Sequence, residues 1–457
     1  MDLPQELRPR AKDEPEDVVF NSKYGLRTIE LNRPKKLNSL NASMARKIVP
    51  RLMEWEKSDM ANVVVMKGAG EKALCAGGDV AELAKVNQAS EDGWRDSASY
   101  FGLEYKLDHL IATYKKPYIS FMDGITMGGG VGLSIHAPFR IATERTVFAM
   151  PETTIGFFPD VGASFFLPRM NGSVGTYLAL TSERIKGANV FYSGIATHYL
   201  HSTSLLALEA RLGELRFRDY DTLETRLKLI NEAIEEFATG LPHDEPIKIR
   251  GAVREAIDRC FCHNTVPEIL QALEREQGET KEWAQKTLET LHQRSPTAVH
   301  VALRQMRVAS RWSIADTFRR EHAIASKFMQ HPDFNEGVTA LLVRKDKPTW
   351  SPETLEAVDK AGSDVAAPFF MFEDVPEAER LQLLNDRDFS EYPHAHLGVP
   401  SEKEVEEAVL AGERTVEEVA GELVRRRNGR QGIRKVVNEI LERKAHVDRA
   451  GKVKWNY

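Results

Sequence analysis

The residues with the clearest chemical potential are two carboxylates, Glu152 and Asp160, that follow a run of glycines. The glycines lie in GITMGGGVGLS (residues 124–134), and the two acids lie in FAMPETTIGFFPDVG (residues 148–162). A glycine lets a main-chain N–H approach a ligand because no Cβ intervenes. A carboxylate in apolar surroundings has its charged form disfavoured, which suits it to act as an acid, a base or a nucleophile. The spacing therefore predicts a site that stabilises a developing oxyanion. Apolar neighbours on both sides of the glycines argue against a flexible linker.

A second glycine segment, CAGGD (residues 75–79), completes the predicted site. It precedes a helix that we expect to begin near Val80. Backbone N–H groups at a helix start are unpaired, so a carbonyl oxygen can accept from one of them. The N–H of Gly129 would supply a second donor to the same oxygen. Two such donors form an oxyanion hole, and losing one typically lowers a rate by about 10²–10³.

Several other kinds of site are disfavoured by spacing. Position 133 is leucine, so the glycine run is not G-x-G-x-x-G, and no glycine run ends in Gly-Lys-Ser or Gly-Lys-Thr. A Rossmann or P-loop nucleotide site is therefore unsupported. The CFCH segment (residues 260–263) and the pair His198 and His201 lack further ligands at zinc spacing, so we expect no metal site. We expect Cys75 to be a small apolar filler rather than a nucleophile.

The composition is that of a globular protein with an uneven charge distribution. The chain has 457 residues, 42% hydrophobic and 28% charged, which is enough for more than one domain. Three cysteines are too few for a disulfide framework, so we expect a reducing compartment. No apolar run approaches the roughly 20 residues that span a bilayer, and the acid-rich first 20 residues resemble neither a secretory signal nor a transit peptide. Residues 425–454 hold eleven Lys/Arg and three Asp/Glu, a balance of +8 within a net charge of −6. This basic tail on an acidic body suggests that the tail has a separate task.

Hydrophobic periodicity predicts an α/β part followed by a helical part. The first part has a hairpin at 18–32, short strands at 63–66, 117–122, 140–142 and 147–149, and helices at 44–57, with Ser43 as N-cap, and at 94–114. Strands separated by helices indicate parallel pairing. The second part has expected helices at 205–215, 222–237, 247–257, 266–276, 280–291, 297–308 and 314–329. After an irregular stretch at 361–400, two capping boxes, Ser401 with Glu404 and Thr415 with Glu418, each predict a short helix, and a third helix is expected at 433–445.

Taken together, the segments LNRPKKLNSLN (residues 31–41), CAGGD, GITMGGGVGLS and MPETTIGFFPDVG resemble the crotonase (enoyl-CoA hydratase/isomerase) superfamily in content, order and spacing. Within it, the chain is most similar to the 3-hydroxyisobutyryl-CoA hydrolases, whose pattern DFNEGVTALLVRKDKPTW (residues 333–350) also matches. The resemblance implies an α/β crotonase (ClpP-like) spiral core of ββα units, followed by a helical part and a C-terminal helical extension. We divide the chain into an N-terminal arm (1–17), a crotonase core (18–203), the helical C-terminal part of that domain (204–355) and an extension with a basic tail (356–457).

The resemblance also implies how the site works. The substrate's thioester carbonyl is expected between the backbone N–H groups of Gly78 and Gly129. The first catalytic glutamate of the hydratases falls at Gly132 and the second at Glu152, so the two-glutamate hydration of a double bond is disfavoured. The implied reaction is hydrolysis of 3-hydroxyisobutyryl-CoA, a step of valine degradation, in the mitochondrial matrix. Glu152 would be its nucleophile or general base, and sequence alone leaves both roles open.

Substrate binding is implied at further positions. Asp160 would orient the hydroxyl or carboxyl end of the acyl group, although an acid after Pro159 could also cap a turn. Glu104 matches a substrate-contacting position, with a solvated helix acid as the alternative. CoA is part of the substrate, so no separate cofactor is expected. Its expected binding residues are Lys35, Leu37, Asn38, Cys75 and Gly77, with its phosphates near Lys35 or Lys36.

The extension suggests a second class of function. The fungal branch of this hydrolase family also serves as a protein of the mitochondrial small ribosomal subunit. In that role, the basic tail would contact ribosomal RNA phosphates and mitoribosomal proteins. The plain alternative is a solvated helix face around Arg425. Crotonases often associate through their helical parts, so a homo-oligomer is a further expectation, whereas no membrane partner is expected.

Overall fold

A twisted, mostly parallel sheet organises the first 200 residues. The computed structural model describes residues 4–242, 245–362 and 364–456. The sheet has the order β1-β2-β3-β5-β7-β10. The first two strands form an antiparallel hairpin and the others pair in parallel. The strands are β1 (Val18–Lys23), β2 (Leu26–Leu31), β3 (Val63–Gly68), β5 (Tyr118–Met122), β7 (Phe139–Ala142) and β10 (His198–Tyr199). Every residue of β5 is buried, as expected for a strand of a parallel sheet that is covered on both faces.

A smaller second sheet runs beside the first and creates the repeating pattern of the core. Its order is β4-β6-β8-β9, and its strands are β4 (Ala73–Cys75), β6 (Ile125–Met127), β8 (Val147–Ala149) and β9 (Ile185–Lys186). The chain places one strand in the large sheet, the next in the small sheet, and then a helix: β3 and β4 precede α2 (Val80–Gln88), and β5 and β6 precede α4 (Gly129–Ile135). This alternation confirms the predicted α/β core of ββα units.

The predicted helices of the core are present, with one error in a cap: they are α1 (Ala42–Lys57) and α3 (Gly93–Ala112), besides α2. Three further core helices, α5 (Ala163–Phe166), α6 (Val174–Thr181) and α7 (Ala188–Tyr192), were not predicted. The prediction of Ser43 as the N-cap of α1 is wrong, because the side chain of Asn41 accepts from the Met44 N–H at 2.9 Å. The Ser43 hydroxyl instead accepts from the Glu14 N–H at 3.0 Å, which ties down the N-terminal arm.

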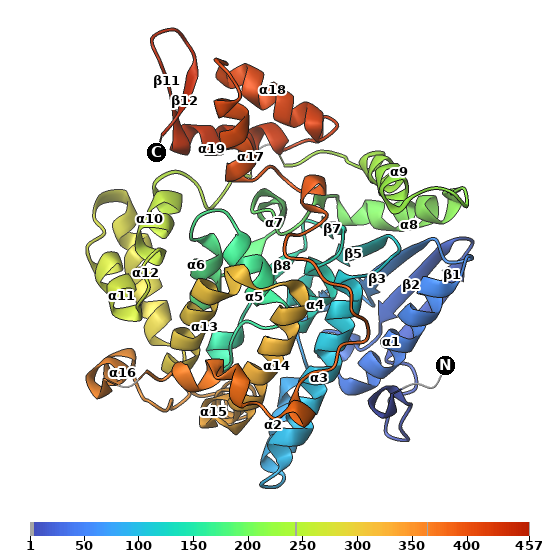
Figure 1. The fold of residues 1–457 in the computed structure, drawn as a ribbon, viewed down its shortest axis with the longest axis vertical. Coiled ribbons are helices and arrows are strands. Elements are labelled where there is room, and N and C mark those ends of the chain that lie inside the picture. The colour runs from blue at the N-terminus through green and yellow to red at the C-terminus, as the bar shows by residue number, and fades with distance from the viewer. Residues whose placement is uncertain (1–3, 243–244, 363, 457) are drawn as a thin grey trace.

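A helical part packs over the core (Figure 1). Its helices are α8 (Leu205–Glu214), α9 (Leu223–Glu235), α10 (Gly251–Phe261), α11 (Val266–Glu274), α12 (Lys281–His292), α13 (Pro296–Val308), α14 (Ile314–Gln330) and α15 (Pro332–Val338). The helix α14 packs along α3, so it reaches the edge of the predicted site. The expected helix at 247–257 starts late, at Gly251, because the backbone of Arg250 is extended, with φ −144° and ψ 169°.

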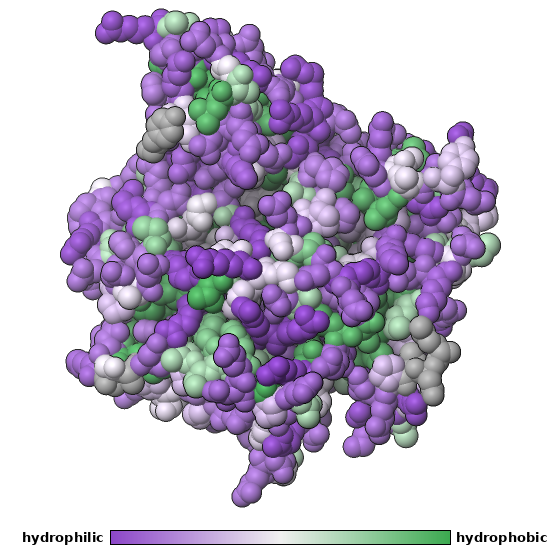
Figure 2. Space-filling view, viewed as in Figure 1, coloured by the Kyte–Doolittle hydropathy of each residue, from purple (hydrophilic) through white to green (hydrophobic). Residues whose placement is uncertain are grey.

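The extension returns across the core and ends in a small subdomain. After α16 (Leu355–Ala361), an irregular stretch crosses the molecule to α17 (Glu402–Leu410), α18 (Val416–Arg426) and α19 (Ile433–Lys444), as Figure 1 shows. Both predicted capping boxes are present. A hairpin that the sequence did not predict, β11 (Ala445–Val447) with β12 (Val453–Trp455), projects from this end. The view in Figure 2 is mostly hydrophilic, including the projecting end. None of the helices in the described part of the chain is long and apolar enough to cross a membrane.

Candidate active site

The two glycine segments meet through strand pairing. The strands β4 and β6, which lead into them, are parallel neighbours. The helix α4 begins at Gly129, and a Cβ on that residue would lie 3.5 Å from the Gly78 nitrogen. Gly77 has φ +113°, a conformation that residues with a side chain rarely adopt. Among the described residues, neither the Gly78 N–H nor the Gly129 N–H donates to another backbone group. Both donors are therefore available to one oxygen atom, as an oxyanion hole requires.

Three carboxyl groups converge beside these donors. Glu152 begins a short 3-10 helix (Glu152–Ile155), and its Oε2 has no hydrogen-bond partner among the described residues. Glu104 lies on α3, and a Cβ on Gly129 would collide with its Oε1. Asp160 accepts a hydrogen bond of 2.6 Å from the Tyr105 hydroxyl. All three carboxyl side chains are almost completely buried. The structure thus brings together every residue predicted to be catalytic or to contact the acyl group.

These groups line a cavity of about 560 Å³. Its apolar wall includes the aromatic rings of Phe101, Phe157 and Phe334. Its mouth includes three of the residues predicted to bind CoA, namely Lys35, Leu37 and Gly77. Lys36 also lies at the mouth, but its ammonium group is paired with Asp79 at 3.0 Å. The cavity can therefore take a ligand whose apolar end enters the protein and whose polar end stays at the surface.

Two predicted CoA contacts are not brought to the cavity. Asn38 is buried, and its side chain is used to hold a turn: it accepts from the Arg33 N–H at 2.9 Å and donates to two backbone carbonyls. Cys75 lies beneath the loop with its Sγ 3.4 Å from the Gly77 oxygen. Burial raises the pKa of its thiol to about 12, so it stays protonated. Both side chains support the binding loop and do not line the cavity.

Burial sets the charge state of the acids. It raises the pKa of Glu104 and of Glu152 well above the ordinary value, and the neighbouring Asp160 raises both further. Burial also raises the pKa of Asp160 to about 7, although the hydrogen bond from Tyr105 lowers that pKa. Within the part of the chain that the structure describes, none of these carboxyls pairs with a Lys, Arg or His side chain. Repulsion in such a cluster keeps at least one of its acids protonated while others are ionised.

The structure reveals a further acid that sequence reasoning missed. Asp108 lies one helical turn after Glu104 on α3, is completely buried, and has no hydrogen-bond partner on either oxygen in the described residues. A Cβ on Gly132 would lie 2.6 Å from its Oδ2 and 2.7 Å from the Cβ of Val161. Position 132 therefore has no room for a side chain. The spacing of Glu104 and Asp108, i and i+4, was the available signal, because it places both on one helix face.

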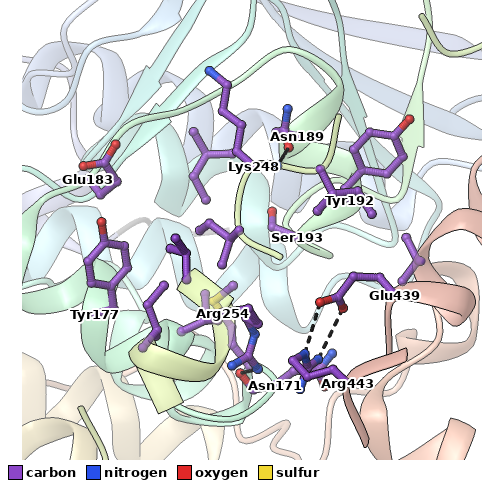
Figure 3. Close-up of a pocket in the computed structure, with 18 of the residues that line it drawn as sticks. Asn171, Tyr177, Glu183, Asn189, Tyr192, Ser193, Lys248, Arg254, Glu439 and Arg443 are labelled. Carbon is purple, nitrogen blue, oxygen red and sulfur yellow. Dashed lines mark hydrogen bonds and ion pairs between the residues drawn. The ribbon is translucent and has the colours of Figure 1, made fainter. Parts of the chain in front are cut away.

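A second hollow lies apart from these acids, between α6, α7, α10 and α19 (Figure 3). Its volume is about 210 Å³, and its lining is mainly apolar. The buried arginines at its base already have acidic partners: Arg254 pairs with Glu402, and Arg443 pairs with Glu402 and Glu439. No residue predicted to be catalytic or to bind the substrate lines this hollow.

The basic tail is not the free cationic surface that its sequence suggested. Arg427 pairs with Glu404 at 2.7 Å, and Arg430 is buried against Glu235 at 2.5 Å. The tail itself (425–454) carries +8, but residues 401–424 before it add eight Asp/Glu and two Lys/Arg, so the balance over 401–457 is +2. Several tail arginines thus hold the extension together and to the core. Among the described residues, the Arg449 side chain on the hairpin loop is exposed and makes no ion pair.

The histidine and cysteine groups do not assemble into a metal site. His198 is buried against Asn231, whereas His201 is exposed. Within the described residues, no three His, Cys, Asp or Glu side chains are grouped so that they could hold a metal ion.

The chain is similar in sequence and in fold to several known proteins. Residues 26–369 match the family described as enoyl-CoA hydratase/isomerase. The small ribosomal subunit protein mS47 of Neurospora crassa is 58% identical over 447 residues, which cover 96% of this chain and 87% of the relative. The mitochondrial 3-hydroxyisobutyryl-CoA hydrolase of Gallus gallus is 42% identical over 347 residues, 76% of this chain and 87% of the relative. The crystal structure of a carnitinyl-CoA dehydratase from Mycobacterium thermoresistibile is similar with a TM-score of 0.69 and 34% identity, covering 81% of this chain and all of that one.

Proposed function

This chain belongs to the enoyl-CoA hydratase/isomerase family, and from that membership we propose that it hydrolyses 3-hydroxyisobutyryl-CoA to 3-hydroxyisobutyrate and CoA. One observation carries the proposal. Gly132 stands where the resemblance places the first glutamate of the hydratases, and Asp108 and Val161 leave no room for a side chain there. Glu152, in contrast, keeps an unpaired carboxyl oxygen beside the two free N–H donors. A carboxyl group next to an oxyanion hole, with no second glutamate at position 132, suits acyl transfer better than addition to a double bond.

In the proposed mechanism, the thioester oxygen accepts hydrogen bonds from the Gly78 and Gly129 N–H groups. The carboxylate of Glu152 attacks the carbonyl carbon and forms an anhydride, while the C–S bond breaks and the CoA sulfur leaves with a proton from Glu104. Water then cleaves the anhydride, which releases the acid, regenerates the Glu152 carboxylate and returns a proton to Glu104. Alternatively, Glu152 accepts a proton from the water that attacks the thioester directly. Both routes consume one water and yield the free acid and the CoA thiol.

The neighbouring acids take complementary parts in this proposal. Glu104, kept protonated by burial and by the charge of Asp160, can donate its proton to the leaving sulfur. Asp160, whose carboxylate is stabilised by the Tyr105 hydroxyl, can accept a hydrogen bond from the hydroxyl of the acyl group. Asp160 would then select hydroxylated acyl chains, because an analogue without the hydroxyl deprives a buried carboxylate of one of its hydrogen bonds.

A substrate comparison tests this function. The purified protein should release free thiol from 3-hydroxyisobutyryl-CoA much faster than from isobutyryl-CoA, which lacks the hydroxyl. With crotonyl-CoA, it should show little hydration of the double bond. Hydration of crotonyl-CoA that outpaces thioester hydrolysis would support the enoyl-CoA hydratase alternative and refute the proposal.

We also propose a second role, as a component of the mitochondrial small ribosomal subunit, and hence a location in the mitochondrial matrix. The supporting observation is coverage: the Neurospora ribosomal relative matches 96% of this chain, whereas the Gallus hydrolase matches 76%. The match therefore extends into the C-terminal extension, most of which lies beyond the family match that ends at residue 369. Docking through that extension would leave the cavity open.

The projecting hairpin offers the sharpest test of this second role. We expect Arg449→Glu with Lys452→Glu to weaken a salt-sensitive association with mitochondrial small subunits, because phosphate contacts depend on such cations. Arg434→Glu is the matched control, since Arg434 is already paired with Glu417 at 2.8 Å. Equal co-sedimentation of both variants and the unmodified protein across a salt series would count against contact through the hairpin.

A further inference from the structure

The backbone that carries Asp160 is strained. Val161, the next residue, has φ +54°, and Gly162 has φ +89°. A positive φ is uncommon for any residue with a side chain, and for a β-branched residue such as valine it is a genuine outlier. Such strain persists only where the surrounding structure holds the backbone in place, and it gathers at functional sites. The groups that hold this loop are therefore of functional interest.

Three buried side chains from outside the loop hold its peptide groups. Gln305 on α13 donates to the Pro159 carbonyl at 2.5 Å. His136 hydrogen-bonds through its ring nitrogen to the Val161 carbonyl at 3.0 Å. Glu321 on α14 accepts from two backbone N–H groups, Gly162 at 2.7 Å and Ser164 at 2.9 Å. The peptide group before Asp160 and the Val161–Gly162 peptide group after it are thus held from outside the loop.

Among these three groups, Glu321 is the one that meets two backbone N–H groups at once. Its two oxygens each meet one N–H, so two acceptors are needed. A glutamine would offer one acceptor and would turn an NH2 group toward the second N–H. Glu321 is completely buried, and other acids of the cluster, Asp160 and Asp108, face the same region. Burying an acid beside other acids costs free energy, and the two hydrogen bonds from backbone N–H groups offset that cost.

We propose that Glu321 is a positioning residue for Asp160: by holding the Gly162 and Ser164 N–H groups, it fixes the strained turn that points the Asp160 carboxyl into the cavity. The proposal rests on the proposed function, in which Asp160 binds the hydroxyl of the acyl group. Glu321 does not line the cavity and so acts only through the loop. The helical part of the chain would then contribute to substrate selection and not only to covering the core.

The experiment measures selectivity in Glu321→Gln. The ratio of kcat/KM for 3-hydroxyisobutyryl-CoA to that for isobutyryl-CoA should fall by roughly tenfold, because one substrate hydrogen bond is misdirected. Hydrolysis of isobutyryl-CoA should change little. Combined with Asp160→Asn, the change should add almost nothing to the loss of selectivity, since both act on the same contact.

The matched control is Asp333→Asn, which alters another buried acid of the helical part, bonded to the Ser295 hydroxyl at 2.6 Å. It should leave the selectivity ratio unchanged. The proposal would be overturned if Glu321→Gln lowered kcat/KM equally for both thioesters. It would also be overturned if its loss of selectivity were fully additive with that of Asp160→Asn. If the unmodified protein hydrolyses neither ester, the proposed function fails. Calorimetric binding of the two esters then tests the positioning role separately, and an unchanged affinity ratio in Glu321→Gln refutes it.

Discussion

Replacing Tyr105 with phenylalanine isolates one hydrogen bond at the proposed site. The change removes the hydroxyl that donates to Asp160 at 2.6 Å and keeps the ring, which packs against Phe101 and Phe318. A hydrogen bond to a charged group contributes about 1.5–3 kcal/mol. At about 1.4 kcal/mol for each pH unit, the pKa of Asp160 should rise by roughly 1–2 pH units. Since burial already raises that pKa to about 7, the variant carboxyl would be protonated at neutral pH.

The pH dependence of kcat/KM for 3-hydroxyisobutyryl-CoA, followed by thiol release, measures this change. If ionised Asp160 is needed, the acid limb of the profile should move to higher pH in Tyr105→Phe, and the two profiles should converge at alkaline pH. Tyr114→Phe is the matched control, because the Tyr114 hydroxyl donates to the Leu52 carbonyl, away from the acids. An acid limb that stays in place, or moves to lower pH, would refute the assigned role of Tyr105.

Three further predictions concern packing, charge and the extension. Gly132→Glu should not create a hydratase, because the new Cβ would lie 2.6 Å from the Asp108 Oδ2. We expect a lower melting temperature instead, since overpacking costs about 1–3 kcal/mol of stability. A folded variant that hydrates crotonyl-CoA would contradict this prediction. Burial, and then the charge of Glu104, raises the pKa of Asp108. The contribution of Asp108 to stability is therefore greatest below its unfolded pKa and falls as pH rises toward its folded pKa. Asp108→Asn should remove about 1.4 kcal/mol of that fall per pH unit in denaturant unfolding, and equal pH slopes in both proteins would count against it. Arg430→Ala should destabilise the protein by about 3–5 kcal/mol in urea unfolding, because Glu235 loses its buried partner. Arg449→Ala is the control and should leave the stability unchanged. Equal effects of the two changes would show that Arg430 does not fix the extension.

Features set by local sequence were predictable. The hairpin at the start of the core, the alternation of strands and helices, and both capping boxes in the extension depend on residues close together in the chain. The glycine segments and the acids at 152 and 160 were likewise recognisable from their order and spacing. Parallel pairing then brings these segments together, which the ββα pattern implies.

Features set by distant partners were not predictable. Ser43 loses its capping role to a contact with Glu14 in the N-terminal arm, 29 residues away in sequence. Asn38 and Cys75 lie in the right segments but point beneath the loop. The positive charge of the tail gave no sign that Arg427 and Arg430 have acidic partners, because those partners belong to other helices. Glu321 follows no motif, and only the fold places it behind Asp160.

The central claim is that Glu152 carries out thioester hydrolysis, and one measurement tests it most directly. CoA release from 3-hydroxyisobutyryl-CoA should be compared between the unmodified protein and Glu152→Gln, with folding of the variant checked by thermal unfolding. A glutamine fills the same space but can neither attack the carbonyl as a carboxylate nor accept a proton from water. We predict that a folded variant loses at least about 10²–10⁴ in kcat. A folded Glu152→Gln protein that releases CoA at the unmodified rate would contradict the account.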